Sequence, residues 1–361
     1  MHDFAVVGAG PAGTRFARSA AERGRSVAVF ERGTVGTPLA CSGHVSTDIW
    51  DYLPADARDA LLQNEIRGAR FHTGGPTSRA HRFYKDRPVS NVIDRVELDR
   101  MLAEVAREAG ARVYENHGVV DVALGADDVT LQVRTPDGTR TETAGMVVGC
   151  DGPTSRVRAA LDLPDPDRVF HGILGFDTTP DHGDFVDVHL TAPGFFAWRI
   201  PRGEAGIEYG VACRPDADPQ SRFERLVDGY EASITTRCSG AIPIGPPDRV
   251  TAGRGLLIGD AAAQTKPFTG GGILYGMTAA DHAATTVDPS VPESLRSYER
   301  AWRADLARDI RLGEVLRRCY RLPTPIQRLG LWLFSGPIGV HMDRPTSFFS
   351  RSHLRALLRR G

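Results

Sequence analysis

The sequence predicts a mixed α/β protein, in which a nucleotide-binding layer of parallel strands and helices is interrupted by a β-rich insertion. Three observations favour this class. Residues 4–31 have the pattern strand, glycine turn, helix and strand. Residues 164–250 are rich in Pro, Asp, Phe and short alternating apolar runs, which are typical of antiparallel strands. Beyond about residue 294 the apolar residues are spaced as in helices.

The expected domain limits follow these changes of pattern. They are residues 1–70, 95–163 and 251–293 for a discontinuous nucleotide-binding domain, 71–94 and 164–250 for a β-rich substrate domain, and 294–361 for a helical, basic C-terminal region.

Length and composition agree with this division. The chain has 361 residues, of which 41% are apolar and 25% charged, close to the averages for soluble globular proteins. That length provides for about two domains. No apolar run reaches the ~18 residues of a membrane-spanning helix, and no signal peptide is recognisable at the N-terminus, so we expect a cytoplasmic protein. The five cysteines are scattered without a CxxC pair, so we expect neither a disulfide framework nor a metal site.

The N-terminal unit carries a dinucleotide fingerprint. Gly8-x-Gly10-x-x-Gly13 lies between an apolar strand at residues 4–7 and a helix that runs to Gly24, and a second strand ends at Glu31. Gly8 permits the tight turn, Gly10 lets the backbone approach a pyrophosphate, and Gly13 lets helix and strand pack closely. Glu31 can accept hydrogen bonds from the hydroxyls of an adenosine ribose. The complete unit is far more specific than the glycines alone.

The other elements expected from periodicity follow in chain order. Asp94 and Glu97 form a capping-box pattern before a predicted helix at residues 98–111. The predicted strands are residues 118–122, 129–133, 146–148, 186–190, 195–200, 206–213 and 254–260.

Two later segments favour FAD over NAD as the cofactor. Each contains a strand that ends in an acidic turn, Asp151-Gly152 in one case and Gly259-Asp260 in the other. The second is followed by Gly270–Gly272, which would leave bare N–H groups at a helix N-terminus. Such donors favour the negative charge of a reduced flavin. With these motifs, residues 1–290 resemble FAD-dependent oxidoreductases with a glutathione-reductase-type fold, in the aromatic-hydroxylase branch. The resemblance implies a flavin-contacting role for Arg95, which could equally be a surface residue, and capping roles for Ser155 and Arg158.

Three further segments resemble the geranylgeranyl reductase family, closest to its archaeal-type digeranylgeranylglycerophospholipid reductases. They are Ala40-Cys41-Ser42-Gly43-His44-Val45-Ser46, the run from Pro193 to Pro201, and the run from Gly259 to Met277. The family signature P-x-x-Y-x-W-x-F-P has Phe196 here in place of Tyr and Ile200 in place of Phe, so a hydroxyl is lost. The resemblance implies saturation of C=C bonds in the geranylgeranyl chains of membrane lipid precursors, with hydride from N5 of reduced FAD and a proton from the protein.

The candidate site residues fall into three groups. The proposed proton donors are Cys41 and His44, although a free cysteine is most often a small buried apolar residue. The predicted substrate contacts are Phe195, Phe196, Trp198 and Tyr275, and the aromatic cluster could also be ordinary sheet core. Lys266 is a supporting candidate. The predicted FAD-binding residues are Gly8, Gly10, Ala12, Gly13, Glu31, Arg32, Cys41, Gly43, Arg95, Val120, Asp151, Gly152, Asp260, Gly270, Gly271, Gly272 and Ile273.

The C-terminal region has the composition of an interfacial anchor. Residues 311–361 contain ten arginines and two acids, a local net charge of +8, whereas the rest of the chain carries −9. Residues 329–340 are apolar and include Trp332. Apolar residues with tryptophan beside arginines favour an anionic lipid surface, so we expect peripheral attachment to the inner face of the cell membrane. A helical lid with a solvated basic face is the alternative.

Other functions remain open at this stage. A flavin monooxygenase acting on an aromatic or a quinone shares the FAD motifs, a reductase of a quinone or pigment side chain shares the chemistry, and a halogenase shares Trp198-Arg199-Ile200-Pro201 but needs a lysine near the flavin. A non-redox lipid carrier is a further alternative. The electron donor could be NAD(P)H or ferredoxin, because no second nucleotide fingerprint is evident. We expect no nucleic-acid partner, since no such motif accompanies the arginines.

Overall fold

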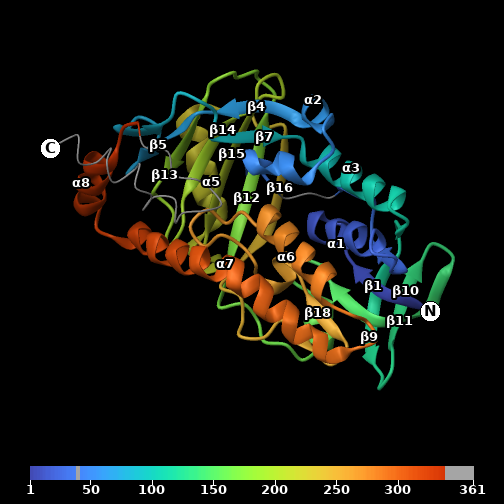
Figure 1. Ribbon diagram of the computed structural model, residues 1–361. Helices are drawn as coiled ribbons and strands as arrows, with labels where there is room; N and C mark the ends of the chain where they lie inside the picture. The colour runs from blue at the N-terminus through green and yellow to red at the C-terminus, as the bar shows by residue number, and fades with distance from the viewer. Residues whose placement is uncertain (38–40, 338–361) are drawn as a thin grey trace.

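A parallel sheet assembled from distant segments forms one end of the molecule (Figure 1). The computed structural model describes residues 1–37 and 41–337. The parallel strands, in spatial order, are β18 (Gly255–Leu257), β11 (Gly138–Gly149), β1 (His2–Val7), β2 (Val27–Phe30) and β8 (Arg112–Tyr114). The carboxyl ends of β1, β11 and β18 therefore meet at one edge, where each is followed by one of the predicted FAD motifs. This is the edge at which open α/β sheets bind ligands.

Antiparallel strands and helices complete this part. The hairpin of β9 (Gly118–Leu124) and β10 (Val129–Thr135) extends β11, and β17 (Thr251–Ala252) pairs with β18. Helix α1 (Pro11–Ala21) packs against α3 (Arg95–Glu108) and α6 (Ile273–Thr286), and the short α4 (Arg156–Ala160) packs beside β11. The predicted helix at 98–111 is thus α3. It begins earlier because Asp94 Oδ1 accepts the Glu97 N–H at 3.0 Å, as the capping box predicts.

A seven-stranded sheet forms the other end. Its order is β16 (Thr236–Ile244), β12 (Arg168–Asp177), β15 (Ile207–Cys213), β14 (Ala197–Pro201), β13 (Phe185–His189), β5 (Gly68–His72) and β6 (Ala80–Tyr84). All neighbours are antiparallel except β13 and β5, which are parallel because residues 68–72 come from a separate segment of the chain.

One helix in this region was not predicted. Helix α5 (Pro219–Tyr230) packs on β12 and β15, where the sequence pattern indicated only strands. Its start is marked by Asp218, whose side chain accepts the Ser221 N–H at 3.2 Å, and by Pro219 in the first turn. That combination is a recognised helix-start signal.

A small sheet lies between the two ends. It contains β3 (His44–Ser46), β7 (Ser90–Ile93) and β4 (Leu62–Ile66), with η1 (Thr47–Tyr52) and α2 (Ala57–Leu61) nearby in the chain. The remaining short helices are η2 (Pro215–Ala217), η3 (Gly259–Ala262), η4 (Pro292–Ser294) and η5 (Cys319–Arg321). The predicted domain limits stay a prediction.

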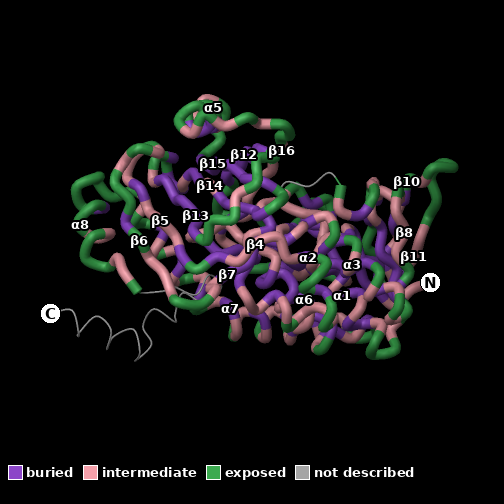
Figure 2. The backbone as a smooth tube through the Cα atoms, turned by 90° about the horizontal axis from the view of Figure 1, so that it is seen from above, coloured by how far each residue is buried: buried purple, intermediate pink, exposed green. Residues whose placement is uncertain are grey.

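The C-terminal region begins with the helix α7 (Leu295–Arg318), which lies along the molecule from near β18 toward α8 in Figure 1. Helix α8 (Thr324–Phe334) follows, and its exposed trace stands out in Figure 2. It exposes large apolar side chains, namely Ile326, Leu329, Trp332, Leu333 and Phe334. The predicted apolar run 329–340 is described only to residue 337, and the arginines at 344, 351, 355, 359 and 360 lie outside the described residues. Within the described part, no helix has the length and apolar composition to cross a bilayer.

Candidate FAD and substrate site

One large cavity joins the edge of the parallel sheet to the face of the seven-stranded sheet. Its volume is about 630 Å³. One compartment is lined by turns that follow β1, β11 and β18 and by the segment before α6. The other is lined by apolar side chains of the seven-stranded sheet and by Leu316, Cys319 and Tyr320 from the C-terminal region. The predicted residues that line this cavity are Gly10, Ala12, Cys41, His44, Arg95, Gly152, Phe195, Phe196, Trp198, Asp260, Lys266, Gly270, Gly271, Gly272 and Ile273.

The need for glycine at the three fingerprint positions follows from what a Cβ at each would contact. Gly8 has φ +99°, and a Cβ there would lie 2.4 Å from the Cys150 carbonyl oxygen on the neighbouring segment. A Cβ on Gly13 would lie 2.1 Å from the Gly8 carbonyl oxygen. A Cβ on Gly10 would meet nothing within 4 Å, because this residue faces the cavity. Gly8 and Gly13 therefore permit the loop, whereas Gly10 leaves room for a ligand.

Glu31 supports the same loop. Its Oε2 accepts the Ala9 N–H at 2.9 Å, and its Oε1 accepts the Gly33 N–H at 3.2 Å. Two lone pairs of the carboxylate are thus used within the protein, and a carboxylate has further lone pairs that can accept from ribose hydroxyls. Arg32 is exposed and Val120 half-buried on β9; neither lines the large cavity.

The two residues of the Asp151-Gly152 turn have different roles. Asp151 Oδ1 accepts from Ser155 Oγ at 2.6 Å, and Oδ2 accepts the N–H groups of Arg156 and Val157 at 2.7 and 3.2 Å. This carboxylate therefore caps α4. Gly152 lines the cavity with φ +81°.

Arg158 connects this turn to the third FAD motif. Its Nη1 donates to the Ala261 carbonyl at 3.2 Å, and its N–H donates to Ser155 Oγ at 2.9 Å. These contacts give Ser155 and Arg158 the capping and packing roles that the resemblance implies.

Asp260 lies at the cavity wall, and its carboxylate has no hydrogen-bond partner within the described residues. Burial raises the pKa of its carboxyl to about 6, although the charge of Arg95 opposes the shift. A Cβ on Gly272 would lie 2.5 Å from Asp260 Oδ1, so the glycine lets the carboxylate sit against the start of α6. Gly272 is the N-cap of α6 and offers no capping side chain, which leaves N–H groups of the first turn available.

Arg95 is buried beside the cavity rather than on a helix surface. Its Nη1 and Nη2 donate to the two oxygens of Asp99 at 2.7 and 3.1 Å, while its Nε has no partner within the described residues. Burial lowers the pKa of Arg95, but Asp99 and the thiol of Cys41 raise it further, so the net shift is upward. Gly43 does not line the cavity. It has φ +68°, and a Cβ there would lie 2.3 Å from the Ile93 carbonyl oxygen.

His44 lines the cavity from β3. Its Nε2 lies 2.8 Å from Ser90 Oγ, and its backbone N–H donates to Ser42 Oγ at 3.2 Å. Cys41, on the loop that leads into β3, and His44, the first residue of β3, therefore both line the cavity.

The apolar compartment has an aromatic wall. Phe195 and Phe196 stack with centroids 4.6 Å apart, and Phe196 packs edge-on against Trp198 at 5.7 Å. Tyr320 packs edge-on against Phe196 at 5.7 Å and donates its hydroxyl to the Phe268 carbonyl at 2.6 Å. The sequence analysis named Phe195, Phe196 and Trp198, although the strand begins at Ala197 and the two phenylalanines lie just before it. It missed Tyr320, because nothing in the local pattern shows that η5 returns to the sheet.

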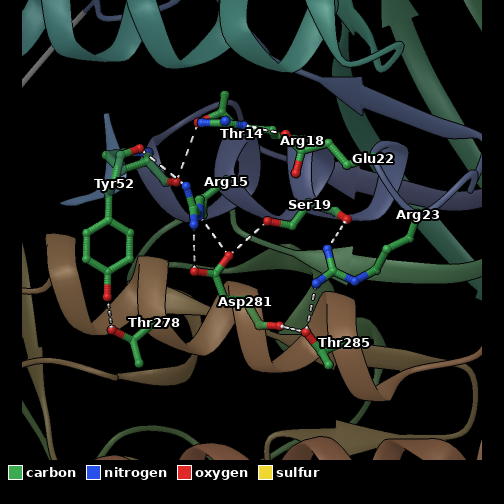
Figure 3. A network of polar contacts seen from close by, with 11 residues as sticks. Thr14, Arg15, Arg18, Ser19, Glu22, Arg23, Tyr52, Thr278, Asp281 and Thr285 are labelled. Carbon is green, nitrogen blue, oxygen red and sulfur yellow. Dashed lines mark hydrogen bonds and ion pairs between the residues drawn. The ribbon is translucent and has the colours of Figure 1, made fainter. Parts of the chain in front are cut away.

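Tyr275 lies elsewhere. It is buried in the core and lines a separate cavity of about 280 Å³ with Arg15, Tyr52 and Asp281. Four residues that line this second cavity, Arg15, Tyr52, Thr278 and Asp281, belong to a polar network between α1 and α6 (Figure 3). Arg15 donates through Nε and Nη2 to the carboxylate of Asp281 at 2.7 and 2.9 Å, and Tyr52 Oη lies 2.8 Å from Thr278 Oγ1. The network fastens α1 to α6, the two helices whose N-termini face the large cavity.

The residues present fit FAD. Gly10 leaves an open approach to the N-terminus of α1, Asp260 offers an unpartnered carboxylate, and Gly272 exposes N–H groups at the start of α6. The Nε of Arg95 and the hydroxyl of Thr269 are buried polar atoms without partners within the described residues, and both residues line the cavity. Buried polar atoms normally have hydrogen-bond partners, so a polar ligand accounts for these exceptions.

Comparisons with known proteins agree with this geometry. The family model for the FAD binding domain matches residues 1–224. A digeranylgeranylglycerophospholipid reductase from Methanothrix thermoacetophila is 33% identical over 336 residues, covering 85% of this chain and 84% of the relative. The crystal structure of a geranylgeranyl bacteriochlorophyll reductase-like protein from Thermoplasma acidophilum superposes with a TM-score of 0.85 at 22% identity, covering 99% of this chain and 98% of that chain. The flavin-dependent halogenase CmlS shares the fold more distantly, with a TM-score of 0.66 at 20% identity over 83% of this chain and 62% of its own.

Proposed function

Because this chain belongs to the geranylgeranyl reductase family of FAD-dependent oxidoreductases, we propose that it saturates C=C bonds in the geranylgeranyl chains of a membrane glycerophospholipid precursor. The observation that carries the proposal is the continuity of the two compartments. An apolar, aromatic-walled space opens directly onto the glycine turns and Asp260 that fit FAD.

The residues around FAD would hold it at the boundary of the compartments. The Gly8–Gly13 loop and the N-terminus of α1 would receive the pyrophosphate, Glu31 the adenosine ribose, and Asp260 the hydroxyls of the ribityl chain or ribose. When bound and reduced, FAD supplies the hydride. An isolated alkene is unpolarised, so the protein must exclude water and align the chain closely. The stacked Phe195 and Phe196 and the indole of Trp198 do this by shaping a dry wall.

Saturation also requires a proton at the second alkene carbon. Cys41, on the loop that leads into β3, and His44, at the start of β3, are the candidate proton donors that line the cavity. Arg95 beside Cys41 and Ser90 beside His44 hold these two side chains in place. We assign the proton donation to one of these two residues, and Cys41→Ala and His44→Ala each tested alone identify the donor by the larger loss of turnover.

The polar end of the lipid would lie at Arg67. Arg67 is exposed, lines the cavity, and its side chain has no hydrogen-bond or ion-pair partner within the described residues. The same cavity is lined by the apolar side chains of Ile66, Phe71 and Phe83. A cation at an otherwise apolar mouth suits a substrate with a phosphate at one end and a prenyl chain at the other.

We propose peripheral attachment to the inner face of the cell membrane, and the position of α8 supports this proposal. Gly336, just after α8, pairs with Phe83 of the cavity wall, and Arg328 Nε donates to Thr73 Oγ1 at 3.1 Å, so α8 lies beside the β5–β6 end of the cavity. Insertion of its exposed apolar side chains into an anionic bilayer would bring the cavity mouth to the lipid.

Liposome co-sedimentation tests this attachment. Binding to anionic vesicles should fall at high salt and in Leu329→Ser/Trp332→Ala. The control variant, Val169→Ser, also removes an exposed apolar side chain, but on β12. Equal binding of all three proteins would refute attachment through α8.

The electron donor would be NAD(P)H or ferredoxin docking transiently. Anaerobic mixing of the FAD-loaded protein with NADH, NADPH or reduced ferredoxin identifies it by the bleaching of flavin absorbance. The competing monooxygenase function predicts oxygen consumption coupled to hydroxylation of an aromatic or quinone substrate, and that coupling would overturn the proposed reduction.

A further inference from the structure

A buried ion pair connects the Cys41 loop to the aromatic wall. Glu208, on β15, has no exposed surface, and Arg202, just after β14, is 7% exposed. Arg202 Nη1 donates to Glu208 Oε2 at 2.9 Å. Neither residue lines the large cavity, and neither belongs to a motif recognised in the sequence.

Glu208 fixes the orientation of Trp198. The indole Nε1 donates to Glu208 Oε1 at 2.8 Å. The opposite residue in the sheet is Gly210, where a Cβ would lie 2.2 Å from the indole ring. Trp198 therefore lies in a notch that only glycine provides, with its nitrogen held by a carboxylate.

Arg202 also donates hydrogen bonds to three separate segments of the chain. Its Nη1 donates to the carbonyl of Ser42, adjacent to Cys41. Its Nη2 donates to Gln63 Oε1 on β4 at 2.6 Å and to the carbonyl of Ile93 at 3.4 Å, two residues before Arg95. One planar guanidinium thus fixes the backbone on both sides of the contact between Cys41 and Arg95, as only a rigid multi-donor fork can.

We propose that Arg202 and Glu208 are positioning residues that set the Cys41 loop at a fixed place relative to the Trp198 wall, and so determine where along the prenyl chain reduction occurs. The expected effect on products rests on the proposed function, whereas the placement of the Cys41 loop by Arg202 and Glu208 does not. Burying two charges merely for stability is a poor device, because apolar side chains of similar volume often serve as well. The pair is explained by the directions of its hydrogen bonds, which reach both walls of the site.

The test removes both charges together in Arg202→Met/Glu208→Met, because removal of one charge would leave the other buried and uncompensated. The control is Arg199→Met/Asp181→Asn. It removes the ion pair between Arg199 on β14 and Asp181 in the segment before β13, and neither residue lines the large cavity. Both variants and the parent are loaded with FAD and compared by melting temperature and FAD content.

The first readout is the rate of Cys41 alkylation by iodoacetamide in the FAD-loaded protein, measured by peptide mass spectrometry. The reference is glutathione added to the same mixture, because the exposed Cys319 itself lines the large cavity. We expect the ratio of the Cys41 rate to the glutathione rate to change at least about threefold in the test variant and to stay at the parent value in the control. An unchanged ratio in a folded, FAD-loaded test variant overturns the proposal. No lipid is used, so failure of the proposed function leaves this result intact.

The second readout is turnover of a geranylgeranyl glycerophospholipid. We expect kcat to fall about 10- to 100-fold with KM within about twofold, because a displacement near 1 Å at the reacting atoms has that effect. The distribution of saturated positions should also change. If the double substitution prevents FAD retention, Arg202→Lys decides by the same readouts: it keeps the charge but cannot reach all three segments, so a parent-like ratio and product pattern would contradict the proposal.

Discussion

The two compartments of the large cavity are built by opposite means. On the side of the parallel sheet, the fit depends on atoms that are missing: the side chains of Gly8, Gly10, Gly13 and Gly272. On the side of the seven-stranded sheet, it depends on large side chains, above all Phe195, Phe196, Trp198 and Tyr320. In the first compartment Gly8 and Gly13 tolerate no Cβ because backbone atoms leave no room, and Gly10 keeps the space for a ligand open. The second compartment can change shape one aromatic residue at a time.

The halogenase and the reductase-like protein both share this fold, although their names give different activities. Fold likeness therefore says little about substrate. We expect the side chains of the aromatic compartment to decide which substrate binds.

The largest effects are expected from two substitutions in the Gly8–Gly13 loop, one on stability and one on FAD retention. Gly13→Ala should destabilise the protein by at least about 3 kcal/mol, because its Cβ would overlap the Gly8 carbonyl. Gly10→Val should change the unfolding free energy by only about 0.5 kcal/mol yet abolish FAD retention. Thermal unfolding and flavin absorbance after gel filtration check both. A flavin-replete, active Gly10→Val protein would refute the assignment of this loop to the cofactor.

Asp260 provides a pH-dependent test. In the FAD-free protein its pKa is about 6, above the ordinary value of 3.8. The folded state then binds more protons than the unfolded state between these values, so the unfolding free energy should fall as pH rises from about 4 to 6, by at most about 3 kcal/mol. Asp260→Asn should remove this decline in thermal-melt profiles.

Binding of FAD should show the opposite dependence on pH. Hydroxyl groups donate to the ionised carboxylate, so FAD affinity should rise as pH increases through about 6 in the parent protein. Titrations followed by flavin fluorescence measure this rise. An Asp260→Asn protein with the same pH profile as the parent would show that Asp260 does not contact FAD.

The aromatic wall should respond in the reverse manner to the glycine loop. Trp198→Ala should leave FAD affinity within about twofold and lower lipid turnover about 10- to 100-fold, because the alkene loses its alignment. The unfolding free energy should fall by about 3 kcal/mol, so both proteins are assayed well below their melting temperatures. Trp198→Phe, which keeps an aromatic ring, is the control for lost bulk. Parent-like turnover in Trp198→Ala would eliminate the wall from the substrate site.

The smallest effect is expected at the mouth. Arg67→Gln should raise KM for a phosphorylated prenyl lipid about two- to fivefold and leave KM for the corresponding alcohol unchanged, since an exposed charge pair contributes at most about 1 kcal/mol. Steady-state kinetics at two salt concentrations measure the difference. Equal effects on both lipids would remove Arg67 from headgroup recognition.

The sequence predicted the FAD compartment in more detail than the rest. Gly8, Gly13, Asp260 and Gly272 lie at strand ends or helix starts, and a backbone requirement of this kind leaves a local signature. Even there, Asp151 proved to cap α4, a role that its motif alone does not distinguish from cofactor binding.

Contacts between distant segments left no such signature. Tyr320 returns from the C-terminal region to the aromatic wall, Arg202 reaches three separate segments, and Tyr275 faces a second cavity because the rotation of α6 fixes its direction. Helix α5 was missed although Asp218 and Pro219 marked its start, because strand-like composition on both sides obscured it.

One measurement tests the central claim most directly: mass spectrometry of a geranylgeranyl glycerophospholipid after anaerobic incubation with the chemically reduced, FAD-loaded protein. This design does not depend on the physiological electron donor. The account predicts mass gains in steps of two hydrogens, with oxidation of an equivalent amount of flavin for each step. No mass gain, with FAD bound and reduced, would contradict it.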